Sequence, residues 1–495
     1  MGIIQKQSIR SSIYIVIGFA IGAFNTLVLF PRFLTKTEFG TTRAMLDVSV
    51  TLFTLSSLGS IPVIYKFFPF YNHYLKGKKN DLPMVTGLAC LLGFTIIAAF
   101  GFFFDDFIIR KLGKSPEFAA YFYTVYPFTF LLLAFTWLEA FAWGLKKTVL
   151  TNFLREAGVR ILAGVLIVLY ALHVISIKSF IHLFSLQYLL PVIILMVVLL
   201  RTGNWQFSFS QISTVTRRLK KRMLSFGLFI FGSQFLNILA KTNDSILILG
   251  LLGVAAMAPY AIAIYMVTIM EIPQRSMNAI SVPVLAESWK NKDMANIEYI
   301  YKKSVANLLV IALGLYGLII LNIHNLTTFL GEGYSEVASI VLIAGAAKVL
   351  DLGTGINGTI IGTSNFWKFD FYTNVFYNII SIPLNFFLIK SFGIVGPAIA
   401  ILISNTLYNG VRSVFLYSKF RLQPYSLKNG LALVIALTSY LVIYFVPRLD
   451  DIYLDGFIRC LLFILLFFIP AYFTKVAPDL NGIVENALRR FRRNS

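Results

Sequence analysis

The chain has 495 residues, of which 58% are hydrophobic and only 13% are charged, and its formal net charge is +21. A soluble globular domain carries about 25% charged residues, so this composition excludes an ordinary soluble protein and indicates a polytopic membrane protein. Cys90 and Cys460 both fall in apolar segments, and the four histidines are far apart. The sequence therefore predicts neither a disulfide framework nor a metal site.

Apolar runs long enough to cross a bilayer recur along the whole chain. They predict an all-α polytopic membrane protein with about fourteen transmembrane helices, and the loops between them are too short for a soluble catalytic domain. The expected helices lie near residues 11–31, 44–65, 83–104, 118–144, 149–172, 177–200, 223–251, 254–281, 304–325, 337–362, 367–390, 394–418, 428–447 and 456–475.

An even number of spans places both termini on the same side of the membrane. Lysine and arginine gather in every second loop, most densely between Arg201 and Arg222, and again in the tail 476–495. Because basic loops stay inside, we expect both termini and the 201–222 loop to be cytoplasmic. The same bias accounts for most of the net charge, so nucleic-acid binding is not needed to explain it.

A weak internal repeat appears at an offset of 218 residues. Leu34 to Gly40, LTKTEFG, falls on Leu252 to Ala258, and Gly144 falls on Gly362. One offset holding at several points predicts two pseudo-symmetric six-helix lobes. We expect an N-terminal lobe, a basic cytoplasmic linker, a C-terminal lobe, helices thirteen and fourteen, and a basic cytoplasmic tail, at 1–200, 201–222, 223–420, 421–475 and 476–495.

Two stretches carry a resemblance to a known family: Ile3 to Gly40, which opens IIQKQSIRSSIYIVIGF, and Asn243 to Ala261, NDSILILGLLGVAAMAPYA. The chain resembles the polysaccharide (O-antigen type) flippases of the MOP exporter superfamily, which also contains lipid II flippases and multidrug and toxin extrusion transporters. Asp244 matches that family's pattern, as do the Leu252-Gly253 turn and Tyr260. Ser245 stands where the family has a basic residue, and Lys241, one turn earlier, is a candidate for that charge.

The resemblance implies a transporter, not an enzyme, in the bacterial cytoplasmic (inner) membrane, with two lobes around a cavity that opens alternately to each side. The implied cargo is an oligosaccharide on a polyprenyl pyrophosphate, moved to the outer leaflet for cell-surface polysaccharide such as lipopolysaccharide. Membrane lipids and polysaccharide polymerase machinery are the implied partners, with no cofactor beyond a proton or Na+ gradient. The two extra helices favour lipid-linked flippases over twelve-helix drug exporters.

Charged residues are costly at membrane depth, yet several predicted spans contain them in pairs of opposite sign. Spacings of three or four residues place such partners on one helix face. One interpretation is that the pairs neutralise each other and help helices to pack. The other is that their cations face a wet cavity and bind a pyrophosphate. The candidate substrate-binding cations are Arg160, Lys241, Lys348, Arg155, Arg275, Arg32 and Arg43.

Asp244, Glu271 and Asp351 are candidates for coupling to a proton or Na+ gradient, because a carboxylate held away from water takes up a cation more readily. Two alternative functions stay open: a drug or cation exporter of the same superfamily, and a membrane-embedded polysaccharide polymerase or ligase. The stretch Gly353 to Gly358, GTGING, matches the dinucleotide pattern GxGxxG. No strand precedes it, so helix packing or a hinge is the better interpretation.

Overall fold

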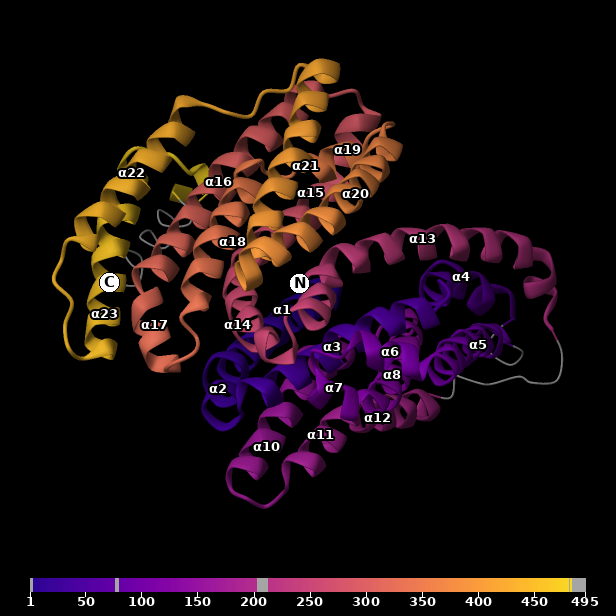
Figure 1. Ribbon diagram of the computed structural model, residues 1–495. Coiled ribbons are helices and arrows are strands. Elements are labelled where there is room, and N and C mark those ends of the chain that lie inside the picture. Colours follow the sequence, from indigo (N-terminus) through magenta and orange to yellow (C-terminus); the bar gives the residue numbers. More distant parts are fainter. Residues whose placement is uncertain (1–2, 76–79, 203–211, 480, 483–495) are drawn as a thin grey trace, which may run out of the picture. The chain divides into compact units, whose positions relative to one another are not determined.

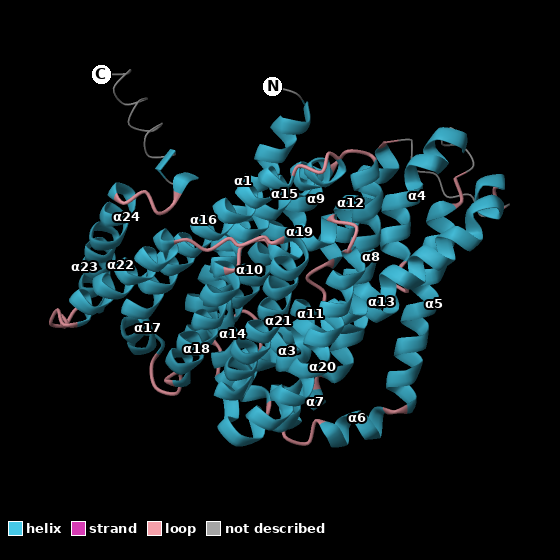
Figure 2. Cartoon of the chain, turned by 90° about the horizontal axis from the view of Figure 1, so that it is seen from above, coloured by secondary structure: helices cyan, strands magenta, loops and turns pink. Residues whose placement is uncertain are grey.

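The computed structural model describes residues 3–75, 80–202, 212–479 and 481–482. Every regular element within these ranges is helical (Figures 1 and 2), which confirms the expected all-α fold. The chain divides into two compact units, Met1–Ala258 and Pro259–Ser495, which we call the N-terminal unit and the C-terminal unit. Each unit has its own hydrophobic core.

The core of the N-terminal unit centres on α8 and α4, with Phe135, Phe141 and Tyr71 fully buried. Its elements are α1 (Ile3–Phe24), η1 (Asn25–Leu29), α2 (Phe30–Phe33), α3 (Lys36–Ser56), α4 (Ser60–Leu75), α5 (Leu82–Phe103), α6 (Asp105–Lys111), α7 (Pro116–Ala120), η2 (Phe122–Thr124), α8 (Val125–Gly144), α9 (Thr148–Asn152), η3 (Phe153–Gly158), α10 (Val159–Ala171), α11 (Ile177–Ser185), α12 (Leu189–Arg201), α13 (Thr214–Leu251) and η4 (Val254–Ala256).

In the C-terminal unit the central helix is α16, whose Tyr301 and Leu308 are buried and which packs against α15, α18, α22 and α23. The elements are α14 (Met257–Thr268), η5 (Ile269–Glu271), α15 (Ile272–Lys290), α16 (Met294–Leu321), α17 (Ile323–Leu330), α18 (Glu336–Gly353), α19 (Asn357–Thr363), α20 (Trp367–Phe392), η6 (Gly393–Val395), α21 (Gly396–Phe420), α22 (Leu427–Tyr444), α23 (Ile452–Phe463), η7 (Ile464–Phe468) and α24 (Ile469–Phe473).

All fourteen predicted spans overlap these helices. Within the described ranges, ten helical stretches are long and apolar enough to cross a membrane, and twelve if two bent pairs each count as one span. One of the ten, Trp367–Phe420, contains both α20 and α21 and so covers two of the predicted spans. The protein is thus a multi-pass membrane protein by length and composition, and the number fourteen stays a prediction.

The second predicted span, 44–65, has wrong limits. The structure has two helices there, α3 (Lys36–Ser56) and α4 (Ser60–Leu75), with a bend of 50° between them. Leu58 and Gly59 adopt positive φ angles of 46° and 73° at this break. A Cβ atom on Gly59 would also lie 2.1 Å from the carbonyl oxygen of Gly227, so only glycine lets α13 pass here. At its other end α3 begins at Lys36, where Thr35 and Glu38 form a capping box.

Helix α13 also differs from the expectation, because it begins inside the predicted 201–222 linker. Ser213 caps it by accepting from the Thr216 N–H, and the Ser213 N–H donates to Asp81 Oδ2 at 2.9 Å. The helix then runs along α3 and α4 (Figure 1), so these contacts lie within the N-terminal unit. The rest of the linker, 203–211, and most of the 476–495 tail lie outside the described residues.

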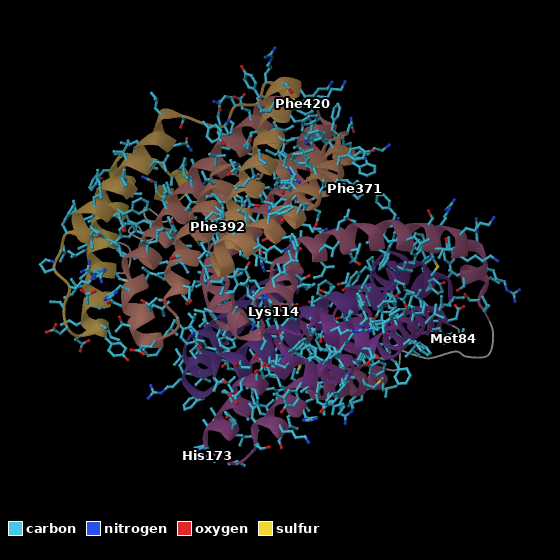
Figure 3. The ribbon with its side chains drawn as sticks, viewed as in Figure 1. Met84, Lys114, His173, Phe371, Phe392 and Phe420 are labelled. Carbon is cyan, nitrogen blue, oxygen red and sulfur yellow. The ribbon has the colours of Figure 1, made fainter. Side chains whose placement is uncertain are left out.

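The loop before α7 fixes the far end of α13. The Lys114 ammonium (Figure 3) donates to the Leu251 carbonyl at 2.7 Å, and Ser115 Oγ donates to the Leu249 carbonyl at 2.9 Å. Carbonyls in the last turn of a helix have no partner within the helix, and a cation there also complements the helix dipole. These two bonds therefore anchor α13 within the N-terminal unit at its C-terminal end as well.

The 218-residue offset recurs in the positions of helix ends. Phe103 ends α5 and Leu321 ends α16, while Lys36 begins α3 and Val254 begins η4. The ends of α8 and α19, and of α12 and α21, agree within one residue of the same offset. These coinciding ends follow the offset found in the sequence, and the pair of pseudo-symmetric lobes stays a prediction.

Candidate functional site

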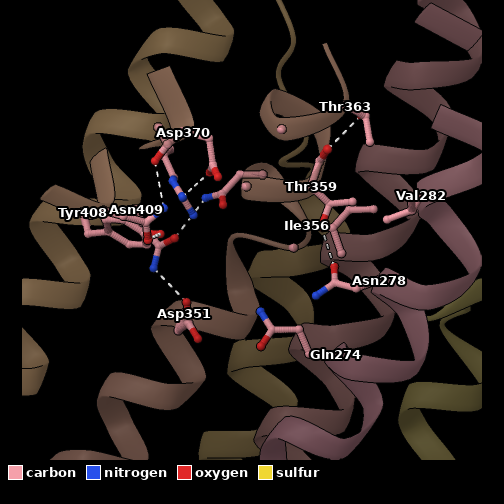
Figure 4. A pocket seen from close by; sticks show the side chains of 16 residues that line it. Gln274, Asn278, Val282, Asp351, Ile356, Thr359, Thr363, Asp370, Tyr408 and Asn409 are labelled. Carbon is pink, nitrogen blue, oxygen red and sulfur yellow. Dashed lines mark hydrogen bonds and ion pairs between the residues drawn. The ribbon is translucent and has the colours of Figure 1, made fainter. Parts of the chain in front are cut away.

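A polar cavity of about 530 Å³ lies within the C-terminal unit. Its walls are α15, the break between α18 and α19, α20 and α21, and Figure 4 shows their side chains from close by. Five side-chain amides line it, from Gln274, Asn278, Asn357, Asn374 and Asn409. Polar groups at membrane depth cost free energy, so such a concentration of them in a membrane-spanning unit indicates a role in binding or transport.

Arg412 on α21 is the buried cation of this cavity, with a side chain only 8% exposed. Its Nη2 forms an ion pair with Asp370 on α20, and its Nε donates to Thr373 Oγ1 at 3.1 Å. The guanidinium also lies 3.9 Å above the ring of Tyr408. Three partners of different chemistry thus hold the guanidinium in a single position.

The glycine-rich stretch that matches GxGxxG lies at a 45° bend between α18 and α19. A Cβ atom on Gly358 would come within 2.5 Å of Arg412 Nη1, so the glycine makes room for the guanidinium. The stretch follows a helix, not a strand, as the sequence analysis expected. Its role in the structure is to admit a charged side chain to the cavity wall.

Hydrogen bonds between side chains connect the helices around the cavity. Asn409 Nδ2 donates to Asp351 Oδ1 at 2.9 Å, and Asn357 Nδ2 donates to Asn409 Oδ1 at 3.0 Å. Tyr408 Oη donates to Asn374 Oδ1 at 3.0 Å. These bonds join α18, α19, α20 and α21, so the cavity wall is held by a connected network.

Lys348, one of the predicted cations, lies between two carboxylates. Its Nζ is 2.9 Å from Glu271 Oε1 and 3.2 Å from Asp351 Oδ2, and its side chain is 15% exposed. Glu271 also pairs with Arg275, another predicted cation, at 2.9 Å. The sequence predicted the pairs within each helix, but the bond from Lys348 to Glu271 joins two helical segments that are far apart in the chain.

In the N-terminal unit Arg155 is bound across helices to Glu139 on α8. Arg155 Nε donates to Glu139 Oε1 at 2.9 Å, its Nη2 pairs with Oε2 of the same carboxylate, and Nη2 also donates to Thr136 Oγ1 at 3.2 Å. The Glu139 side chain is 2% exposed. Arg155 lies in η3, a π-helical turn, and such turns occur frequently at functional sites.

Two other predicted cations form pairs within their own helices. Arg160 Nη1 lies 2.9 Å from Glu156 Oε2, and Arg43 Nε lies 2.9 Å from Asp47 Oδ2. Both spacings are four residues, as the sequence predicted. The backbone carbonyl of Arg160 also accepts from Asn25 Nδ2 at 2.7 Å, which fixes α10 against η1.

Lys241 and Asp244 lie three residues apart on α13 but differ in exposure. Lys241 is exposed on α13 while Asp244 is buried, and their pairing is not among the ion pairs of the described residues. Side chains three residues apart lie on the same side of a helix, about 60° apart around its axis, so spacing alone does not explain why one is exposed and the other buried. Arg32, at the end of α2, is exposed as well and is likewise outside those ion pairs.

Sequence reasoning missed Arg412 and Asp370, and it did not find Glu139 as the partner of Arg155. Asp370 and Arg412 are 42 residues apart, and no periodic pattern within one helix connects them. The available signal was the presence of a charge in each of two neighbouring spans, since an unpaired charge at that depth is costly.

Comparisons with known proteins place this fold. No protein-family model matches the chain, and no curated protein matches it. Among solved structures, the lipid II flippase MurJ in an inward closed conformation matches with a TM-score of 0.73 at 14% identity, over 94% of this chain and 99% of that chain. The chain shares the fold of that solved structure.

Two solved structures of MATE transporters also share this fold. An inward-facing MATE transporter of the MOP superfamily matches with a TM-score of 0.57 at 15% identity, over 84% of this chain and 98% of that one. A Vibrio cholerae MATE transporter matches with a TM-score of 0.51 at 13% identity, over 84% and 97%. This chain therefore shares its fold with all three of these solved structures.

Proposed function

We propose that the protein is a flippase that moves an oligosaccharide linked to polyprenyl pyrophosphate from the inner to the outer leaflet by alternating access, for cell-surface polysaccharide synthesis. The observation that carries the proposal is the match to the lipid II flippase over 94% of this chain, against 84% for the MATE structures. The unmatched 6% is about 30 of 495 residues, fewer than the stretch 421–495, so the match extends into α22–α24. Those helices follow the two repeated sets of six.

For the pyrophosphate we propose Lys241 as the leading contact. Of the seven predicted cations, Lys241 and Arg32 are those outside the ion pairs that the described residues form, so their charges are not already balanced by a carboxylate. Arg43, Arg155, Arg160, Arg275 and Lys348 would have to share or exchange a carboxylate to bind the cargo. An anionic group binds most strongly to a cation that does not have to break another ion pair first.

A proton or Na+ gradient remains the proposed driving force, with Asp244, Glu271 and Asp351 as candidate coupling residues. Glu271 and Asp351 both hold Lys348, and the bond from Glu271 joins η5 to α18, so uptake of a proton by Glu271 would weaken that contact. Such a loosened contact is the kind of change that a gradient can use to shift a conformational equilibrium. Collapse of one gradient at a time, with flipping as the readout, separates the two ions.

The proposed location is the bacterial cytoplasmic membrane with both termini inside. Cysteines introduced singly at Ile212 and Glu332, in a background without Cys90 and Cys460, test this in intact cells. An impermeant maleimide should label position 332 and spare position 212 until the cells are opened. Labelling of position 212 in intact cells would contradict this topology.

The function itself is tested by deletion of the gene in cells that make the polysaccharide. We expect surface polysaccharide to disappear and lipid-linked oligosaccharide to accumulate on the cytoplasmic side. Each alternative predicts a different result: loss of tolerance to cationic drugs with normal polysaccharide for an exporter, and single oligosaccharide units on the outer leaflet for a polymerase. Either result would contradict the flippase proposal.

A further inference from the structure

We propose that the polar cavity of the C-terminal unit binds the sugar part of the cargo, separately from its pyrophosphate. This inference rests on the proposed function and adds the place where the oligosaccharide is recognised. The cavity, at about 530 Å³, falls within the roughly 300–1,000 Å³ of typical ligand pockets. It has room for a short stretch of sugar rings, not for a whole polymer.

Several polar atoms of the cavity wall have no hydrogen-bond partner among the described residues. Gln274 points into the cavity (Figure 4) and makes none of the side-chain bonds found there. Asn278 Oδ1 accepts a hydrogen bond from Thr359, and Asp370 Oδ1 pairs with Arg412. The other polar atoms of these two side chains, Asn278 Nδ2 and Asp370 Oδ2, form no hydrogen bond among the described residues. None of these atoms is among the buried unsatisfied ones, so each is accessible from the cavity.

The remaining atoms include both donors and acceptors, and this mixture identifies the ligand class. A sugar hydroxyl donates one hydrogen bond and accepts others, so it can bond an amide nitrogen and a carboxylate oxygen in turn. A pyrophosphate only accepts, and Asp370 Oδ2 would repel it. Arg412, the cation among the described residues that line the cavity, is already paired with Asp370, so these residues offer a pyrophosphate no unbalanced cation.

The wall is also held in place before any ligand arrives. Asn357, Asn409 and Asp351 bond one another across three helices, and Tyr408 bonds Asn374. Groups fixed in this way lose little further freedom on binding, which favours affinity for a polar ligand. By contrast, another cavity of the same unit is lined by Leu313, Leu437 and Phe463, and it suits an apolar ligand.

The test measures binding of a free oligosaccharide to the purified full-length protein. The probe is the oligosaccharide released by mild acid from the polyprenyl-linked lipids of the producing cells, labelled with tritium at its reducing end. Gln274→Leu combined with Asn278→Leu removes the Gln274 amide and the remaining Nδ2 donor of Asn278 from one face of α15, together with the bond from Thr359 to Asn278. Ser276→Leu is the matched control, because Ser276 is exposed on the same helix and does not line the cavity.

We expect the double variant to bind about tenfold more weakly, since two neutral hydrogen bonds are lost. Ser276→Leu should bind as the wild type does, and inorganic pyrophosphate should not compete. If the double variant is poorly folded, Val282→Trp is used instead, because the larger side chain at the cavity wall should block the probe. Unchanged affinity in both, or competition by pyrophosphate, would overturn the sugar site.

Flipping of the intact lipid-linked oligosaccharide is measured on the same wild-type preparation in liposomes, so that the two proposals can fail separately. If the protein flips the lipid but its binding of the oligosaccharide does not depend on Gln274 and Asn278, the sugar site is refuted and the flippase proposal stands. Binding that depends on them, without flipping, would keep the site and refute the flippase.

Discussion

Arg412 on α21 is held against Asp370 on α20 by an ion pair, with Tyr408 beneath the guanidinium and Gly358 beside it. This pair joins two neighbouring helices at the wall of the polar cavity. Removal of one partner would leave the other charge buried and unbalanced, which typically costs about 3–5 kcal/mol.

We therefore predict that Asp370→Leu lowers the free energy of unfolding by about 3 kcal/mol, because Arg412 is left without its carboxylate. The double variant Asp370→Leu with Arg412→Leu should recover most of that loss. Chemical unfolding of the purified protein in detergent measures both. A single variant as stable as the wild type would show that the pair is not a buried charge pair in solution.

Gly358→Ala should destabilise the protein, although alanine normally stabilises a helix by up to about 1 kcal/mol relative to glycine. The added methyl group would displace the Arg412 guanidinium, at a cost of about 1–3 kcal/mol. Gly410→Ala on α21 is the control, because a Cβ atom there has nothing within 4 Å. Equal melting temperatures for the two variants would contradict the close approach of Arg412.

In the N-terminal unit, Glu139→Leu should cost about 3–5 kcal/mol, because it leaves Arg155 unpaired next to the buried face of α8. Glu156→Leu is the comparison, since its pair with Arg160 is about a third exposed and should contribute roughly 0–1 kcal/mol. Thermal unfolding and the amount of protein in the membrane report both effects. A larger loss for Glu156→Leu than for Glu139→Leu would reverse this ranking.

Lys241→Ala should insert and fold normally, because the side chain is exposed. Flipping should fall about 10- to 100-fold, as expected when a charged hydrogen bond of about 1.5–3 kcal/mol to the pyrophosphate is lost. Lys241→Arg should keep part of the activity, since the charge remains. Lys220→Ala, an exposed lysine on the same helix, serves as the control. Normal surface polysaccharide in the Lys241→Ala strain would remove this residue from the proposed pyrophosphate site.

Much of the fold could be predicted from the sequence, because hydrophobic length determines where a chain can cross a bilayer. The break at Leu58–Gly59 could not, since it depends on positive φ angles inside an otherwise continuous apolar run, whereas the glycine-rich stretch around Gly355 was already a candidate hinge. The start of α13 was also missed, because its basic first turns read as a loop and become helical after the Ser213 cap.

Some ion pairs could likewise be predicted from the sequence, and others could not. Pairs within one helix, such as Glu156 with Arg160, follow from spacing alone and were predicted. Pairs between helices, such as Asp370 with Arg412 and Glu271 with Lys348, depend on which helices pack together, and a single sequence does not give that. Lys241 shows the limit of spacing, because it is exposed while Asp244 is buried.

The most direct test of the account is transport by the purified wild-type chain in liposomes that contain a polyprenyl-pyrophosphate oligosaccharide labelled on its sugar. An enzyme that cannot cross the membrane cleaves only the outward-facing lipid. In protein-free liposomes, cleavage should stop once the outer leaflet is consumed, about half of the label. With the protein present, we predict that cleavage proceeds to completion. Cleavage that still stops at the outer leaflet, under either a proton or a Na+ gradient, would contradict the proposal that this protein is a lipid-linked oligosaccharide flippase.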